Sequence, residues 1–224
     1  MIIPKYNVIF IHNPKTAGES IIRALGIPPD YIRARGMTRR YKKNKKIFYN
    51  RGYHLNWHES LRYHKEYMTG HMNYRSFYKF MFVRHPVDRF ISVFKWYKRG
   101  GNQSKIDRNI CACMPENVND LAKIIKDIQK KFSNTHFYPQ VDIATGLLDD
   151  FDFIGRFENL ADDWDYIRNH LNIYDKTHDL KKSHERSVTE FSKSEISINS
   201  ESLNILRDVY REDFDRFGYD INII

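Results

Sequence analysis

Short apolar runs alternate along the chain with longer stretches that repeat apolar residues at helical spacing. Four apolar runs predict strands at residues 6–12, 67–71, 78–83 and 151–155. Stretches with helical patterns predict helices at residues 18–26, 87–98, 117–131 and 159–171. One face of a closing helix is marked by Leu203, Leu206, Tyr210, Phe214 and Phe217. This alternation predicts a parallel sheet covered on both faces.

Size and charge narrow the class of protein. The chain has 224 residues, which suits a single domain spanning 1–224. Lys and Arg number 37 against 28 Asp and Glu, a net charge of +9, and this excess implies an anionic partner such as a nucleotide, an acidic glycan, nucleic acid or a membrane surface. Residues 33–51 hold nine Lys or Arg and no acid. They mark a basic, aromatic excursion at about 30–65, which a solvated loop explains equally well.

Cysteine usage and hydropathy favour a cytoplasmic protein. Cys111 and Cys113 are the two cysteines, too few for a disulfide framework and without zinc-finger spacing. Residues 1–12 lack the features of a signal peptide. No apolar run is long enough to span a membrane, so no membrane partner is expected.

A lysine-bearing loop follows the first predicted strand and leads at once into a helical pattern. Its sequence from residue 13 is Asn-Pro-Lys-Thr-Ala-Gly-Glu-Ser. Backbone N–H groups, a helix N-terminus and the Lys15 ammonium then face one point, which is a good arrangement for holding a phosphate. The loop differs from the Walker A motif, because Lys15 precedes Gly18 and the first glycine is absent. ATP or GTP hydrolysis is therefore disfavoured.

A second basic position follows the strand predicted at residues 78–83. Arg84 leaves that strand at the same edge of the sheet as Lys15, and a guanidinium suits bidentate phosphate binding. The alternative for Arg84 is a salt bridge to Asp88 that holds the turn, and a structural role is favoured for Arg89. Two anion sites of this kind suggest a ligand with phosphate at both ends.

The segments at 13–20 and 82–89, in this order, resemble the sulfotransferase superfamily, closest to its carbohydrate (glycosaminoglycan-type) branch. Segments 151–160 and 210–219 resemble later elements of that family, so the resemblance spans nearly the whole chain. Pattern and resemblance together predict an α/β fold, a P-loop-like three-layer sandwich with a central parallel sheet flanked by helices. The resemblance implies 3′-phosphoadenosine 5′-phosphosulfate (PAPS) as the sulfuryl donor, adenosine 3′,5′-bisphosphate as the product, and no metal.

The resemblance also assigns binding residues. The 5′-phosphosulfate loop comprises Pro14, Lys15, Thr16, Ala17, Gly18, Glu19 and Ser20. Arg84 and Ser92 would hold the 3′-phosphate, although Ser92 is alternatively a buried helix hydroxyl. Arg156 would lie near the adenine or ribose, with a helix-start salt bridge as the alternative. Ser183 matches a serine that closes over a cofactor phosphate, although a solvated linker is the favoured interpretation of its segment.

Glu19 departs from the family pattern, in which a Thr or Ser hydroxyl commonly meets the phosphate. A carboxylate beside a phosphate repels it, so Glu19 is expected to point away or to meet the acceptor. At a helix N-terminus it also favours the helix dipole. The hydroxyl contact then passes to Thr16 or Ser20.

The acceptor needs a base, and histidine is the usual choice near neutral pH. His71 is the predicted base, because Gly70-His71 ends a predicted strand and resembles the Gly-His step of glycan sulfotransferases. A hydrogen-bonded structural histidine is nearly as good an interpretation. Weaker candidates lie in the basic excursion: His54, His58, Glu59 and His64.

The predicted reaction is in-line transfer from PAPS to an acceptor hydroxyl, with a sugar hydroxyl favoured. Lys15 would stabilise the charge that builds on the leaving phosphate oxygen. Two rivals stay open: a P-loop-like nucleotide-dependent kinase, and a non-catalytic nucleic-acid-binding protein. Against a kinase, the chain has no Walker A lysine. Against a nucleic-acid-binding protein, that function would not explain why Lys15 and Arg84 each follow a predicted strand, so no nucleic-acid partner is expected. The sequence gives no oligomeric state.

Overall fold

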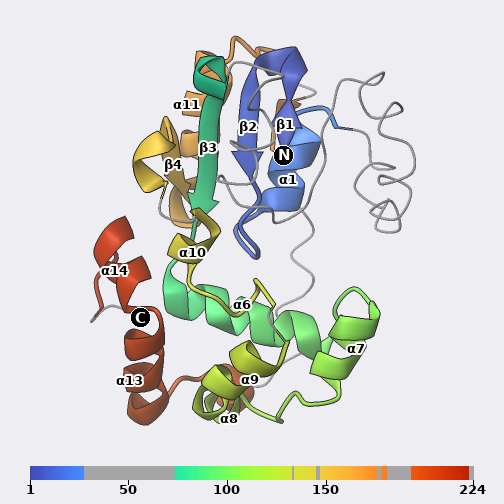
Figure 1. The fold of residues 1–224 in the computed structure, drawn as a ribbon, viewed down its shortest axis with the longest axis vertical. Coiled ribbons are helices and arrows are strands. Elements are labelled where there is room, and N and C mark those ends of the chain that lie inside the picture. The colour runs from blue at the N-terminus through green and yellow to red at the C-terminus, as the bar shows by residue number, and fades with distance from the viewer. Residues whose placement is uncertain (28–73, 133, 145–146, 176–177, 181–192, 222–224) are drawn as a thin grey trace. The chain divides into compact units, whose positions relative to one another are not determined.

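The computed structural model describes residues 1–27, 74–132, 134–144, 147–175, 178–180 and 193–221 (Figure 1). The chain divides into two compact units. The first comprises Met1–Val83 and Ile143–Ser183, and the second comprises Arg84–Asp142 and His184–Ile224. That residues 1–224 act as one domain stays a prediction.

The first unit contains a four-stranded sheet in the order β1-β2-β3-β4. Its strands are β1 (Ile2–Ile3), β2 (Val8–Ile11), β3 (Tyr78–Val83) and β4 (Phe153–Arg156). Pairing is parallel between β2 and β3 and between β3 and β4, which confirms three of the predicted strands. The all-parallel prediction is wrong at one edge, because β1 pairs antiparallel with β2. A short 3₁₀ turn (η1, Pro4–Tyr6) and a left-handed Asn7 (φ 53°) reverse the chain between them.

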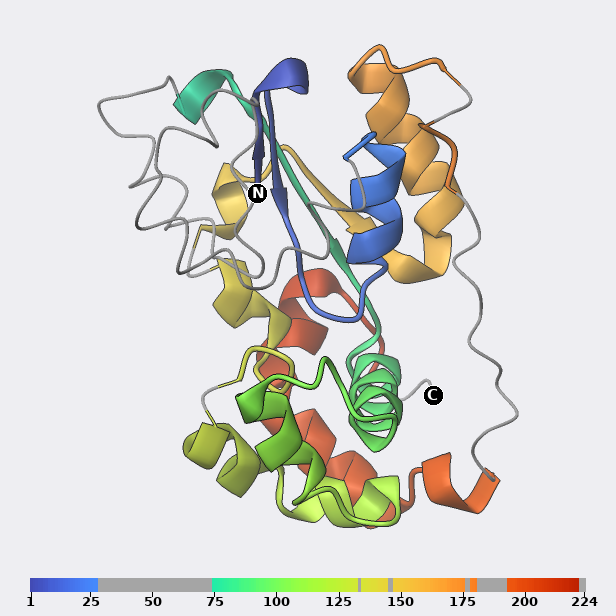
Figure 2. The same ribbon diagram turned by 90° about the vertical axis from the view of Figure 1, so that its right-hand side faces the viewer.

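Two helices cover one face of this sheet. α1 (Gly18–Ala24) and α11 (Leu160–His170) lie on the same side of the strands in Figure 2. Their side chains form one core with alternate residues of the central strands; its largest members are Phe10, Phe80, Phe82 and Trp164. Residues on the opposite face, such as Ile9 and Met81, are also buried. Burial of both faces explains why the strands read as continuous apolar runs.

Short 3₁₀ turns complete the described part of the first unit: η2 (Tyr74–Ser76), η3 (Leu148–Asp150) and η4 (Phe157–Asn159). Gly155 of β4 is paired with Phe82 of β3. A Cβ at Gly155 would lie 2.5 Å from the Phe82 ring, so the missing side chain makes room for that ring in the core.

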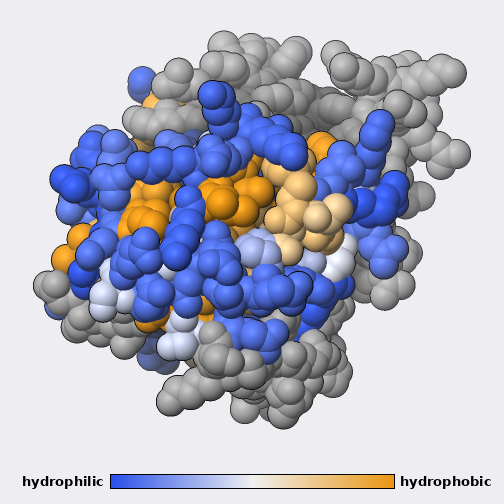
Figure 3. All heavy atoms as spheres, turned by 90° about the horizontal axis from the view of Figure 1, so that it is seen from below, coloured by the Kyte–Doolittle hydropathy of each residue, from blue (hydrophilic) through white to orange (hydrophobic). Residues whose placement is uncertain are grey.

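The second unit is helical in its described residues. Its helices are α6 (Pro86–Lys98), α7 (Lys105–Cys111), α8 (Val118–Lys123), α9 (Ile125–Phe132), α12 (Lys193–Ile196), α13 (Ser200–Val209) and α14 (Arg211–Phe217), and α10 (Gln140–Ala144) crosses the boundary between the units. A second core joins α6 to α8 and to the C-terminal helices through residues such as Phe94, Leu121 and Leu206. Viewed from below, the described residues present a mainly hydrophilic surface with smaller apolar patches (Figure 3).

The helix predicted at residues 87–98 is confirmed as α6, but three other predictions need correction. α7 lies between the helices predicted at 87–98 and 117–131, where the sequence pattern predicts no helix; Ser104 caps it by accepting the Asp107 N–H at 3.0 Å. The helix predicted at 117–131 is two helices, α8 and α9, that meet at Ile124. The closing helix is also two, because the chain bends at the buried Tyr210, whose hydroxyl donates to the Phe137 carbonyl at 3.0 Å.

The strand predicted at residues 67–71 and the basic excursion lie outside the described residues. Within the described part of the chain, no helix combines the length and apolar character that crossing a membrane requires.

Candidate active site

The lysine-bearing loop leaves β2 at the carboxyl edge of the parallel strands, where α/β proteins commonly bind ligands. The register pairs Ile11 of β2 with Met81 of β3. Just beyond it, the fully buried Asn13 donates from Nδ2 to the Phe82 carbonyl at 3.0 Å. This bond fastens the start of the loop to β3. Asn13 is not among the predicted site residues, although a polar residue directly after a buried strand is a recognisable signal.

The loop backbone adopts a conformation that side chains usually avoid. Lys15 (φ 68°) and Ala17 (φ 65°) are both in the left-handed region although neither is glycine. Between them, the buried Thr16 donates from its hydroxyl to the Asn13 carbonyl at 2.9 Å and stabilises the turn. Left-handed residues can turn successive N–H groups toward one side and so form a concave anion site. Each costs of order 1–3 kcal/mol, and such strain is typical of functional loops.

Gly18 is required by a contact inside the fold. A Cβ at this position would lie 1.8 Å from Cδ2 and 1.9 Å from Nε2 of His12. The buried His12 ring stacks in turn on Phe10, with centroids 6.1 Å apart and planes at 21°. Gly18 was predicted only as part of the phosphate-binding loop, and His12 is not among the predicted site residues. The structure adds that the glycine admits an imidazole beneath the loop.

We expect Gly18→Ala to lower the free energy of unfolding by about 1–3 kcal/mol, the usual cost of overpacking. The added methyl group would displace the His12 ring, which urea titration measures as a lower midpoint. The His12→Ala variant serves as the control background, since it removes the clashing ring. Adding Gly18→Ala to that background should cost less than in the wild type, and equal costs in both backgrounds would refute the clash.

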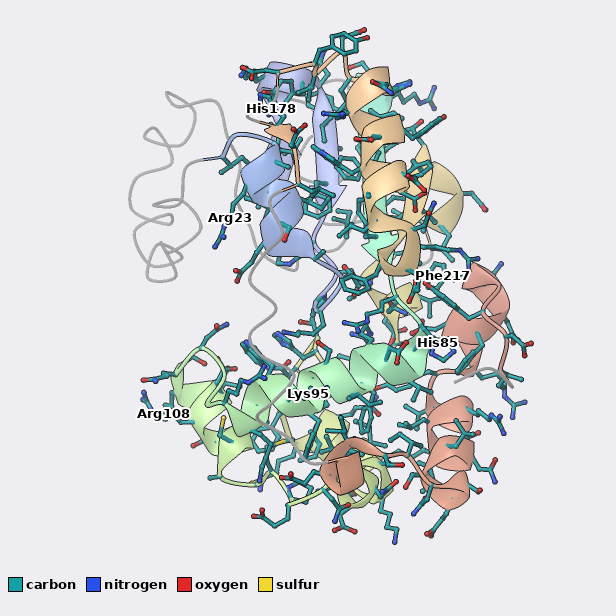
Figure 4. All side chains as sticks on the ribbon, turned by 180° about the vertical axis from the view of Figure 1, so that it is seen from behind. Arg23, His85, Lys95, Arg108, His178 and Phe217 are labelled. Carbon is teal, nitrogen blue, oxygen red and sulfur yellow. The ribbon has the colours of Figure 1, made fainter. Side chains whose placement is uncertain are left out.

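The remaining loop residues differ in how they meet their surroundings. The Glu19 carboxylate lies 3.8 Å from Arg23, one turn along α1, and both side chains are about half exposed. Arg23 is labelled in Figure 4. Glu19 is therefore directed along the helix surface. Because Thr16 uses its proton to hold the turn, the half-buried Ser20 hydroxyl is the other predicted donor to an anion.

Arg84 follows β3 directly and is held by its backbone. Its N–H donates to Oε1 of Gln140 at 3.0 Å, and its carbonyl accepts from Nε2 of the same side chain at 2.8 Å. Gln140 is fully buried, so this two-point clamp is shielded from water. The clamp fixes the Arg84 backbone before α6 begins. Gln140 could not be predicted, because no local pattern in the sequence marks it.

Asp213 of α14 holds Gln140 in place. This fully buried carboxylate accepts the N–H of Gln140 at 2.8 Å and that of Val141 at 2.9 Å. Burial raises the pKa of Asp213, while the Arg89 charge and these N–H donors act in the opposite direction. The chain therefore links its C-terminal helix to the Arg84 backbone through two buried side chains.

Arg89 has the structural role predicted for it. Its side chain is buried, with Nη1 donating to the His136 carbonyl at 3.3 Å and Nη2 to that of Tyr138. Among the described residues Asp88 forms no ion pair, so the salt bridge offered as an alternative role for Arg84 is not found there. Ser92 lies half-buried on α6.

Arg156 ends β4 beside Val83, the last residue of β3. Its backbone N–H donates to Oδ2 of Asp163 at 2.6 Å, and Asn159 donates to the other oxygen at 2.9 Å. Asp163 thus secures the turn into α11 through the Arg156 backbone. The Arg156 side chain is exposed at the carboxyl edge of the sheet.

Three parallel strands therefore each lead into a basic residue at their carboxyl ends. A model of the sulfotransferase family matches residues 1–220 of the chain. The chain belongs to the sulfotransferase family. Searches of curated proteins and of solved structures gave no significant match. Membership confirms the superfamily predicted from the two motifs and supports an enzyme that transfers a sulfuryl group.

The predicted site residues of this sulfotransferase fall partly inside and partly outside the described residues. Ser183 and His71 lie outside the described residues, as do His54, His58, Glu59 and His64. Lys15 and Arg156 belong to the first unit, and Arg84 and Ser92 to the second. Within the described ranges, no group of three or more His, Cys, Asp or Glu side chains is arranged to hold a metal ion.

Proposed function

We propose that this sulfotransferase takes PAPS as its donor and transfers the sulfuryl group to a hydroxyl of a carbohydrate. The observation that carries the donor assignment is the strained Lys15 loop at the carboxyl edge of the sheet. A loop with a cation, oriented N–H groups and no Walker A sequence suits the 5′-phosphosulfate end of the donor. The clamped Arg84, which directly follows the neighbouring strand, suits the phosphate at the other end.

The proposal gives each residue a role. Lys15 neutralises the charge that develops on the leaving phosphate oxygen, while residues 14–20 bind the 5′ end through their backbone and through the Ser20 hydroxyl. Arg84 and Ser92 bind the 3′-phosphate, Arg156 contacts the adenine or ribose, and Ser183 closes over a phosphate.

For the reaction, the acceptor oxygen attacks sulfur as the sulfur–oxygen bond to the leaving phosphate breaks. His71 takes the proton of the acceptor hydroxyl. General base catalysis of this kind typically raises the reaction rate by about 10²–10⁴. No metal is assigned a role in this proposal.

A carbohydrate acceptor is proposed from the resemblance to the glycan branch and from the net charge of +9. Acidic glycans are polyanions, and a basic protein attracts them at long range. The protein is proposed to act in the cytoplasm. The two rivals, a kinase and a nucleic-acid binder, predict different ligands.

We expect adenosine 3′,5′-bisphosphate to raise the melting temperature well above the shift given by ATP with Mg²⁺. A ligand that binds only the folded state at 100 times its Kd adds about 2.7 kcal/mol of stability. Thermal shift titrations of both nucleotides measure this, with Arg84→Ala as the variant that should lose most of the bisphosphate effect. Equal shifts from both nucleotides would favour the kinase, and strong salt-dependent binding of random nucleic acid would favour the nucleic-acid binder.

A further inference from the structure

The two ends of the Lys15 loop meet at one contact inside the first unit. His12 is the residue after β2 and Gly18 is the first residue of α1, so residues 13–17 lie between them. Figure 2 shows this loop leaving the end of β2 and turning back into α1. A Cβ on Gly18 would lie 1.8 Å from Cδ2 of His12, so the Gly18 backbone rests directly on the imidazole ring. The contact fixes the span that the loop bridges.

The His12 ring is in turn held by the sheet. It stacks on the ring of Phe10, with centroids 6.1 Å apart and planes at 21°. Phe10 is fully buried in the core that the sheet shares with α1, and His12 is buried beside it. The imidazole is therefore a well-fixed support between that core and the first turn of α1.

The loop needs such a support, because its backbone is strained. Lys15 and Ala17 are both in the left-handed region, and residues of this kind persist only where the surrounding structure over-determines them. The Asn13 amide and the Thr16 hydroxyl form hydrogen bonds that hold the beginning of the loop, and neither bond reaches α1. The contact with His12 supports the other end of the loop, directly after Ala17.

We propose that His12 is a positioning residue of the donor site, whose ring holds the strained loop in the conformation that binds the 5′ end of the donor. This inference rests on the proposed function. Without the ring, the left-handed residues can relax to commoner conformations, and the loop N–H groups no longer converge on one point. Only the molecules that keep the loop conformation then bind, so the apparent Kd rises by the inverse of their fraction.

Calorimetry with adenosine 3′,5′-bisphosphate on the full chain, well below the unfolding transition, tests this role. His12→Ala should lower the affinity about tenfold, which corresponds to about one molecule in ten with the loop in place. Ile167→Ala is the matched control, because Ile167 is fully buried in the same core but lies on α11. That variant loses core packing as well, yet its affinity should stay within about twofold of the wild type.

Gly18→Ala gives a second test, since His12 is proposed to act through Gly18. The added methyl group displaces the ring, so this variant alone should weaken binding about as much as His12→Ala. Because residues in contact do not contribute additively, the double variant should lose about tenfold in affinity. A loss of roughly a hundredfold, the product of two independent effects, would overturn the action through Gly18.

Two further measurements separate positioning from stability. In sulfuryl transfer, His12→Ala should raise the KM for PAPS and leave kcat within about threefold, because the loop binds the ground state and the transition state alike. Hydrogen exchange without nucleotide should show faster exchange of the amides of residues 15–18 in His12→Ala, and no change there in Ile167→Ala.

The outcomes distinguish this inference from the proposed function. If the wild type binds the bisphosphate and His12→Ala keeps its affinity, or Ile167→Ala loses as much, His12 has no positioning role. If the wild type does not bind the bisphosphate, hydrogen exchange decides. Faster exchange of the loop in His12→Ala would then reject the donor and leave the support by His12 intact, and unchanged exchange would reject both.

Discussion

Replacing Lys15 with asparagine should lower the rate of sulfuryl transfer by about 10²–10³ while largely preserving the binding of adenosine 3′,5′-bisphosphate. The positive charge matters most when negative charge builds on the leaving phosphate oxygen, so its loss raises the barrier more than it weakens ground-state binding. Asparagine suits this position because Lys15 has a φ of 68° and asparagine tolerates the left-handed region. The variant therefore removes the charge without adding backbone strain.

Radiolabelled PAPS and a panel of desulfated glycosaminoglycans would measure this rate, and calorimetry would measure the binding. The matched control is Lys123→Asn on α8, whose ammonium lies 3.4 Å from Glu201 in a surface ion pair. It should keep the wild-type rate. A Lys15→Asn variant that transfers the sulfuryl group at the wild-type rate would remove Lys15 from the mechanism.

Strands with strong local signals could be predicted from the sequence. β3 was predicted with its exact bounds, because a mainly apolar run, interrupted by Lys79, is closed by Arg84 and a proline-led helix. β1 could not be predicted, since two residues carry no period and their pairing depends on a tight reversal through Asn7. The breaks at Ile124 and Tyr210 were missed for a similar reason. Helical periodicity continues through both, and tertiary contacts decide where the chain bends.

The candidate site shows the same division between local and distant information. The Lys15 loop is contiguous, so its chemistry is visible in the sequence. Asn13 and Gln140 act on residues 69 and 56 positions away, and no local pattern encodes such bonds. Burial also separates two arginines that look alike in sequence, because Arg89 donates to backbone carbonyls within the core.

The largest loss of stability is expected at Asp213. We expect Asp213→Ala to lower the free energy of unfolding by about 3–5 kcal/mol, because it leaves the buried N–H groups of Gln140 and Val141 unpaired and removes the acceptor of the Gln140 side-chain amide. Since domains of this size are stable by about 5–15 kcal/mol, the loss would be a large share of the total. Urea unfolding followed by circular dichroism measures it.

A neighbouring aspartate gives the matched control, since Asp215 lies on the same helix but is exposed. Asp215→Ala should change the free energy of unfolding by no more than about 0.5 kcal/mol. Asp213→Asn, studied below its unfolding transition, should also bind adenosine 3′,5′-bisphosphate more weakly than the wild type, because Gln140 loses the anchor that lets it hold Arg84. Equal stability of the two alanine variants would show that the buried network does not support the helical unit. A destabilised Asp213→Asn variant with unchanged affinity would separate this network from the anion site and leave it a purely structural role.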